Sequence, residues 1–201
     1  MKSKIFVLGL FVMLSCSLSA QEKRSIGFTF SAIGANGVIN SAGKSLEGEA
    51  SYSGKRFYSL GISYVHPVRS WIGIESGIEY SRHTITVEPM SMPDMEYPKY
   101  DKNISLINIP ITARINFLKY LFFNGGILLD IETGSSSPID SQTGLGALFG
   151  IGAKYNLSNG IGAFVNGYGK FHSLVPFSAD NDKHRWKFIE GGLRMGLTYD
   201  F

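Results

Sequence analysis

The chain has 201 residues, with 19 Lys and Arg against 16 Asp and Glu, 17% charged residues, 13% aromatic residues and 24 glycines. A balance this close to neutral argues against nucleic acid as a partner, because binding to phosphate backbones requires clustered Lys and Arg. Abundant glycine, and the lack of any periodic segment rich in Ala, Glu, Lys and Leu, predicts low helix content.

Residues 1–20 have the layout of a secretory signal peptide. Two lysines precede an apolar run from Ile5 to Leu14, and small and hydroxyl-bearing residues then lead to Ala20. The run is shorter than the ~20 apolar residues that a membrane-spanning helix needs. We therefore expect cleavage before Gln21, which leaves residues 21–201 as one domain.

The only cysteine of the chain, Cys16, lies in this leader. It loosely resembles the lipidated residue of a lipoprotein processing site, although Met13 and Leu14 fit that pattern poorly. Two of the 19 basic residues also belong to the leader, so residues 21–201 carry 17 basic and 16 acidic residues. A domain without cysteine has no disulfide, cysteine metal site or thiol nucleophile.

Eight segments alternate apolar and polar residues with a period of two, which predicts β-strands with one apolar and one polar face. In the last of them, apolar residues occupy odd positions from Ile189 to Phe201, and charged, small or hydroxylated residues occupy the even ones. In the seventh, the best phase sends Val165 outward and Tyr168 inward. The segments are 25–32, 56–66, 71–83, 106–117, 121–132, 144–155, 160–172 and 189–201.

The connections between these segments alternate in length. Short links are expected near 67–70, 118–120 and 156–159, and longer ones near 35–54, 88–102, 133–141 and 174–185. An up-and-down meander of this kind behind a signal peptide is typical of bacterial outer-membrane barrels with short periplasmic turns and longer external loops. The sequence predicts an all-β fold, an eight-stranded antiparallel up-and-down transmembrane β-barrel.

A soluble barrel such as a periplasmic lipocalin would show the same period with its apolar face turned inward. Its polar face would meet water and would carry many Lys and Glu residues. Here the polar faces consist of glycine, serine, asparagine and isolated charges, while the apolar faces are continuous in Ile, Leu, Phe and Tyr. We therefore expect the apolar faces to contact lipid, with the soluble lipocalin-like barrel as the alternative.

Two residues interrupt the pattern. Trp71 would point inward by strict parity, so it either lies at the rim or marks a slip in phase. Pro110 lacks the N–H group that a strand in hydrocarbon must pair, and we expect a bulge or a local irregularity there.

The polar faces bring charges of both signs into the predicted lumen. Charges removed from bulk water must be paired, so we predict a network of ion pairs and hydrogen bonds, with no catalytic, metal-binding or cofactor-binding residues. An eight-stranded barrel has an interior only wide enough for side chains, which argues against an open pore. The predicted network comprises Glu75, Glu79, Arg114, Asp130, Glu132, Lys154, Lys170, Glu190 and Arg194, and Asp200 shares their face.

A ladder of glycines lies on the inward face of the sixth segment. Gly146, Gly150 and Gly152 are expected to leave room inside the barrel for Phe164 and Tyr168.

The sequence FHSL places His172 beside Ser173, and lipid-modifying barrels that use histidine and serine are known. Adjacent strand residues face opposite sides, however, so these two cannot form the hydrogen-bonded pair that such chemistry needs unless the strand has ended. We expect no hydrolase site, and we place His66, His83 and His184 at the rim or in loops.

The layout of residues 21–201 resembles the small outer-membrane β-barrel proteins of Bacteroidota that are called PorT-like. The resemblance rests on INIPITARINFLKYLFFNGGILLDI, in which an isoleucine-proline strand, a short turn and an aromatic strand with Gly125 and Gly126 follow one another. The terminal GLRMGLTYDF adds to it. These motifs are structural, and the family supplies no shared catalytic residue.

The resemblance implies that Tyr199 and Phe201 form a C-terminal signal for the barrel-assembly machinery. One member of the family acts in protein secretion, which keeps a secretion-accessory role open. We expect a non-enzymatic barrel in outer-membrane lipid, with external loops for partner binding or envelope integrity. The alternative is a lipid- or small-ligand-handling barrel, a class that includes lipid hydrolases. A tunnel toward the bilayer would favour the alternative, and a lumen packed shut would favour the first hypothesis.

Overall fold

The computed structural model of the chain describes residues 23–40, 50–90, 97–134, 139–177 and 185–201. The expected signal peptide, with Cys16, lies outside these residues, and so does His184. Within the described ranges no helix is long and apolar enough to cross a membrane. The strands are β1 (Ser25–Asn40), β2 (Ser51–Arg69), β3 (Ile72–Glu88), β4 (Tyr100–Phe117), β5 (Leu121–Glu132), β6 (Gly144–Asn156), β7 (Ile161–Pro176) and β8 (Trp186–Asp200).

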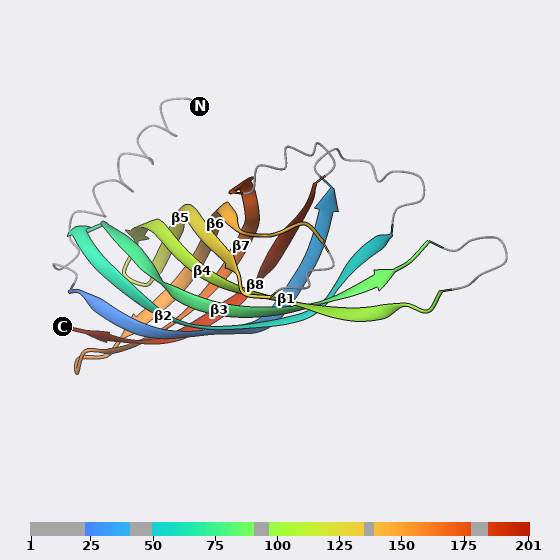
Figure 1. The fold of residues 1–201 in the computed structure, drawn as a ribbon. Helices are drawn as coiled ribbons and strands as arrows, with labels where there is room; N and C mark the ends of the chain where they lie inside the picture. Colours follow the sequence, from blue (N-terminus) through green and yellow to red (C-terminus); the bar gives the residue numbers. More distant parts are fainter. Residues whose placement is uncertain (1–22, 41–49, 91–96, 135–138, 178–184) are drawn as a thin grey trace, which may run out of the picture.

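The eight strands form one closed antiparallel barrel (Figure 1). Each strand pairs with the next one in the chain, and β1 closes the ring along β8, from Ser25 opposite Asp200 to Asn40 opposite Trp186. Closure leaves no edge strand with unpaired backbone groups, which is the condition for a sheet to cross lipid. The predicted eight-stranded up-and-down barrel is confirmed.

Side chains alternate between the two surfaces of the barrel as the period of two predicts. Ile62, Ile78 and Leu197 point outward and are 59%, 62% and 64% exposed, whereas Glu75 and Asn166 point inward and are buried. A polar interior inside an apolar outer surface is the arrangement of a transmembrane barrel, and the reverse of a soluble one.

The two ends of the barrel differ in their connections. At one end, which we call the short-turn end, tight turns join β2 to β3, β4 to β5 and β6 to β7 (Figure 1). Trp71 lies in the first of these turns, 39% exposed, and its carbonyl accepts a hydrogen bond from Asn116. It is therefore a rim residue.

At the opposite, long-loop end, the strands run farther than the sequence pattern indicates. β1 continues to Asn40 and β2 begins at Ser51, so the connection predicted at 35–54 is shorter than expected. The added residues of β1 and β2 are rich in glycine and polar side chains, which carry no period-two signal. Backbone pairing with the neighbouring strands continues through them, and Val38 and Tyr52 also pack against buried apolar side chains.

Pro110 causes no bulge. Ser76 pairs with Ile111 and Glu79 with Asn108, so the register of β3 against β4 is the same on both sides of the proline. The two residue pairs between them are missing from the ladder, whereas Pro110 keeps its position opposite Leu128 of β5. The irregularity expected there is a local gap in pairing, because proline has no N–H group to donate.

Candidate functional site in the barrel lumen

Inward side chains fill the lumen in successive zones from the short-turn end to the long-loop end. A cavity of 300 Å³ opens at the short-turn end, and we call it the vestibule. Lys23, Lys154 and Asp200 line it, and its floor includes Arg114 and Phe164. A polar recess of this kind holds water or a small polar group more readily than an apolar one.

Above the vestibule, Glu75 of β3 is buried between two arginines. Its Oε1 accepts a hydrogen bond from Arg194 Nη2 at 2.8 Å, and its Oε2 accepts bonds from Arg114 Nη1 at 3.3 Å and Asn124 Nδ2 at 3.5 Å. Glu75, Arg114 and Arg194 are at most 6% exposed. We call these three residues the charged centre, and together they carry two positive charges and one negative.

Aromatic rings stabilise the extra positive charge of the charged centre. The Cζ atom of Arg114 lies 3.7 Å from the centre of the Phe122 ring, and that of Arg194 lies 5.8 Å from the Phe164 ring. A guanidinium over a ring face is attracted by the negative face of the π system, and the attraction strengthens where water is excluded.

The prediction that the glycines of β6 make room for Phe164 and Tyr168 is wrong. A Cβ atom on Gly152 would lie 2.5 Å from the Phe122 ring, which belongs to β5. Phe164 instead packs over Gly196 of β8. A glycine opens space for whichever neighbouring strand leans across it, and parity along one strand cannot identify that strand.

A second group of charges surrounds Lys170 of β7. Its Nζ donates to Glu79 and lies 3.5 Å from Glu190 Oε1. The Tyr168 hydroxyl donates to Glu190, and Ser31 Oγ lies 2.9 Å from the same hydroxyl. These contacts join the residues into one connected polar network. Such partners are what allows the carboxylates of Glu79 and Glu190 to be buried.

Two histidines lie beside that network in the lumen. His172 Nδ1 lies 3.1 Å from Asp130 Oδ1, and Glu190 Oε2 lies 3.4 Å from His83 Nε2 and 3.7 Å from His172 Nε2. Both rings are fully buried. The expectation that His83 is a rim or loop residue is wrong, because β3 stays regular to Glu88 and keeps His83 on its inward face.

Ser173 also turns into the lumen, contrary to the expectation from strict alternation. The register of β6 against β7 shifts at this point, and Ser173 has a φ of 46°, so it and His172 are both buried. They still do not form a nucleophile–base pair. Ser173 Oγ accepts a hydrogen bond from Arg185 at 3.2 Å, and the nitrogens of His172 face Asp130 and Glu190.

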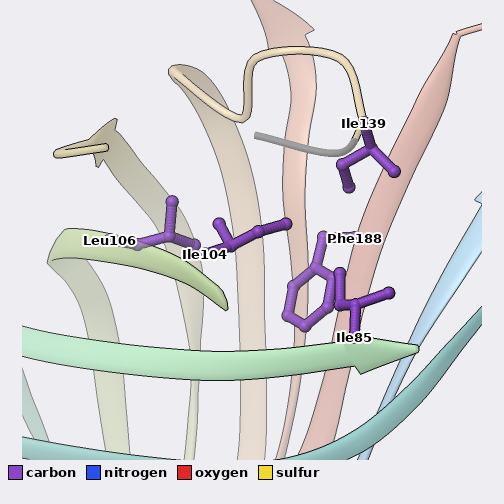
Figure 2. Close-up of a cluster of buried hydrophobic side chains, with 5 residues drawn as sticks. All are labelled: Ile85, Ile104, Leu106, Ile139 and Phe188. Carbon is purple, nitrogen blue, oxygen red and sulfur yellow. The ribbon is translucent and has the colours of Figure 1, made fainter. Parts of the chain in front are cut away.

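Apolar side chains close the lumen at the long-loop end (Figure 2). They come from β3, β4 and β8 and from the β5–β6 connection, and they converge on the Phe188 ring. We call this cluster the apolar cap. Its members are Ile85, Ile104, Leu106, Ile139 and Phe188.

Polar contacts hold the β5–β6 connection over the cap. Gln142 Nε2 donates to the Trp186 carbonyl at 3.0 Å, and Gln142 Oε1 accepts the Phe188 N–H at 3.0 Å. The Gln142 N–H donates to Glu132 Oε2 at 2.8 Å. These bonds tie the connection to β8 and β5, and so they fix Ile139 above the lumen.

The structure thus brings seven of the nine predicted lumen charges into the buried interior and separates the other two. Glu132 binds the connection over the cap, and Lys154 lines the vestibule. Tyr199 and Phe201, the predicted assembly signal, lie on the outer surface, 53% and 57% exposed, and the Phe201 N–H donates to the Arg24 carbonyl.

Sequence reasoning missed His83, His172, Gln142 and Arg185 as parts of the interior. Extending the period of two along β3 and β7 would have placed the two histidines inside. Gln142 and Arg185 lie outside the strands and carry no pattern that signals their contacts. Among the described residues, no group of three or more His, Cys, Asp or Glu side chains is arranged to hold a metal ion.

No protein-family model and no curated protein sequence matches the chain. Its fold is similar to that of the outer membrane protein AlkL, determined by solid-state NMR in DMPC lipid bilayers, with 14% identity, a TM-score of 0.51, and coverage of 91% of this chain and 92% of that one. The fold is that of a small outer-membrane barrel. OprG from Pseudomonas aeruginosa is also similar, with 12% identity, a TM-score of 0.50, and coverage of 91% and 98%. Identities this low concern the fold alone.

Proposed function

We propose that the chain is a non-enzymatic integral protein of the bacterial outer membrane, with a closed barrel that presents its long-loop end to partners in the envelope. The observation that carries this proposal is the packed lumen. Between the vestibule and the long-loop end lie the charged centre, the network around Lys170 and the apolar cap, each made of buried side chains. An eight-stranded barrel filled in this way offers no path for a solute.

The arrangement of His172 and Ser173, the histidine–serine candidate among the described residues, supports a non-enzymatic barrel. A serine hydrolase needs its base within hydrogen-bond reach of the nucleophile and of the substrate. His172 is engaged between Asp130 and Glu190, Ser173 is engaged by Arg185, and all of these side chains are at most 5% exposed.

The long-loop end carries the surface best suited to a partner. In Figure 1 the far ends of β3 and β4 project beyond the barrel body. Met90, Tyr97 and Tyr100 lie there, 51%, 48% and 47% exposed. Tyrosine and methionine are enriched at protein interfaces. The resemblance to PorT-like barrels supports a secretion-accessory or envelope-integrity role for this surface.

Assembly follows from the same proposal. The signal peptide over residues 1–20 delivers the chain to the periplasm, and the barrel-assembly machinery recognises the C-terminal segment that contains Tyr199 and Phe201. The exposure of both rings on the outer surface supports this role, because a machine that reads the strand must contact its side chains.

Ion conductance tests the closed lumen. The purified barrel is reconstituted in planar bilayers, with a porin in the same bilayers as the positive control. We expect no conductance steps from folded protein. Folding is shown by a gel on which the unboiled sample migrates differently from the boiled sample. A stable open conductance would overturn the proposal and would favour a barrel that handles small ligands.

Photo-crosslinking tests the partner surface. A crosslinking amino acid replaces Tyr97 or Tyr100, and the control variant carries it at Tyr120 in a short turn. We expect one defined protein adduct in cells from the first two positions and none from the third. Adducts to lipid alone, or to the same proteins from all three positions, would contradict the assignment.

A further inference from the structure

A second polar site lies on the outer surface of the barrel, away from the lumen. A cavity of 380 Å³ opens between the outer parts of β2, β3 and β4. Two arginines line it, both exposed. The lining residues are Arg56, Phe57, Tyr58, Arg82, Thr84 and Asn103.

The pairing of the strands brings the two arginines to one patch. Arg56 lies opposite Thr84, and Arg82 lies opposite Tyr58. The rings of Tyr58 and Tyr80 stand side by side just below, with their centres 6.5 Å apart. The patch therefore sits directly beyond a pair of outward tyrosines, where aromatic girdles mark the boundary of the hydrocarbon.

The height of Arg82 above the short-turn end agrees with that boundary. β3 begins at Ile72, and Arg82 is its eleventh residue. Ten steps of about 3.3 Å along a strand tilted by about 40° rise by roughly 25 Å, which is the height of the apolar band of such barrels. Arg82 thus lies at the level of the headgroups of the leaflet on the long-loop side.

Among the described residues, no carboxylate forms a close ion pair with either arginine, although the Asp101 carboxylate lies near enough to interact with the charge of Arg56. Two acidic residues at the same end of the barrel each pair with a lysine: Asp101 Oδ2 lies 2.6 Å from Lys55 Nζ, and Glu88 Oε1 lies 2.9 Å from Lys99 Nζ. The two arginines therefore leave an excess of positive charge beside lipid, where an unpaired charge is unfavourable.

A polar side chain adds a donor to the same cavity. Thr84 Oγ1 donates to Asn103 Oδ1 at 3.0 Å. This bond orients the Asn103 amide, so its NH₂ group remains to donate to another acceptor. The two guanidinium groups and the Asn103 amide together form a set of donors that suits a tetrahedral oxyanion.

We propose that Arg56 and Arg82 bind a phosphate group of an outer-leaflet glycolipid, with Asn103 as an additional donor. The acyl chains of that lipid would lie along the apolar surface below, over Tyr58 and Tyr80. Arginine suits this role because its planar, permanently charged group binds phosphate through paired hydrogen bonds. The site is independent of the closed lumen and of the partner surface.

Native mass spectrometry of the detergent-purified protein tests the proposal. The probes are lipid A with its phosphates, the same lipid after dephosphorylation, and inorganic phosphate as a competitor. The test variant is Arg56→Gln with Arg82→Gln, and Arg82→Lys asks whether charge alone is sufficient. Arg69→Gln is the matched control, because Arg69 is an exposed arginine at the other end of β2. Heat modifiability shows that each variant has folded.

We expect the wild type and Arg69→Gln to retain phosphorylated lipid A. The double variant should retain at least about tenfold less lipid A than the wild type, because two charge-assisted phosphate contacts are removed. Dephosphorylated lipid A should bind weakly, and to the same extent, to the wild type and to every variant. Equal retention by the folded double variant would overturn the site. Displacement of lipid A by inorganic phosphate at similar concentration would overturn the lipid as its ligand.

Discussion

The charged centre and the apolar cap close the same lumen by different physical means. The charged centre consists of Glu75 between Arg114 and Arg194, where each buried charge depends on its neighbours. The apolar cap consists of hydrocarbon side chains packed on Phe188, where each member contributes in proportion to the area it buries. The charged centre should therefore lose its stability as a unit, whereas the apolar cap should lose stability in proportion to the area that each substitution exposes.

Glu75→Gln should have the largest effect. It leaves Arg114 and Arg194 buried without a counter-charge, and breaking a buried ion pair in this way costs about 3–5 kcal/mol. The measurement is urea unfolding of the barrel in lipid vesicles, with Glu132→Gln as the control, because Glu132 is only partly buried. Equal, small losses in both variants would show that the charged centre is not a unit.

A triple replacement tests whether the three charges of the charged centre act as a unit. Glu75→Leu together with Arg114→Met and Arg194→Met removes all three charges at once, and it should be much less destabilising than Glu75→Gln. A loss that equals or exceeds that of the single variant would mean that the pairs contribute net stability.

Phe188→Ala should cost about 3 kcal/mol, because it removes a fully buried ring from the apolar cap and leaves a cavity. Conductance should stay absent, since the charged centre still fills the lumen below. The unfolding midpoint in urea and a planar-bilayer recording of the same sample measure the two effects. Conductance steps in this variant would show that the cap alone closes the barrel.

Gly152→Ala tests the packing beside the charged centre. The new methyl group would lie 2.5 Å from the Phe122 ring and 2.6 Å from the Val165 carbonyl oxygen, so backbone must shift at a cost of about 1–3 kcal/mol. Gly167→Ala is the control, because there the nearest atoms are 3.8 Å and 3.9 Å away. Thermal unfolding should separate the two variants.

Asp101→Asn should have the smallest effect. Hydrogen bonds from Lys55 and Thr86 hold the pKa of this exposed carboxyl, at the outer end of β4, below its ordinary value. A lowered folded-state pKa stabilises the protein above the unfolded-state pKa, and this contribution is lost as pH falls through the folded-state pKa. The difference from wild type in unfolding midpoint should be slight at neutral pH and absent in acid. A difference that grows in acid would mean that folding does not lower the pKa of Asp101.

The parity of the strands could be predicted from the sequence, because lipid and lumen impose opposite demands on successive residues. It placed Glu75, Arg114 and Arg194 on inward faces without any knowledge of their partners. Parity could not predict which inward side chains contact each other across the lumen. The pairing of Glu75 with Arg194 joins residues 119 positions apart, and it depends on how the ring closes.

The remaining misses have local causes. Ser173 departs from alternation because a shift of register and a positive φ turn it inward, and no residue type in FHSL requires that turn. His83 departs from the rim position expected for it because the alternation of β3 continues past the predicted segment with the apolar residues, Ile85 and Val87, on the inward face. The apolar cap is not predicted because Ile85, Ile104 and Phe188 lie on strand ends beyond the predicted segments. Ile139 reaches the lumen from a connection between strands, where periodicity gives no information.

Nitroxide scanning can show whether the apolar face of the barrel contacts lipid. Because Cys16 is the only cysteine and lies in the expected signal peptide, single cysteines at Ile74, Ile78 and Tyr97 can each be spin-labelled in reconstituted protein. We predict that oxygen, which concentrates in lipid, speeds the relaxation of the labels at positions 74 and 78, and that a water-soluble nickel chelate does not. For the label at position 97 we predict the opposite. Access of the nickel chelate to all three positions would contradict the account and would identify a barrel in water.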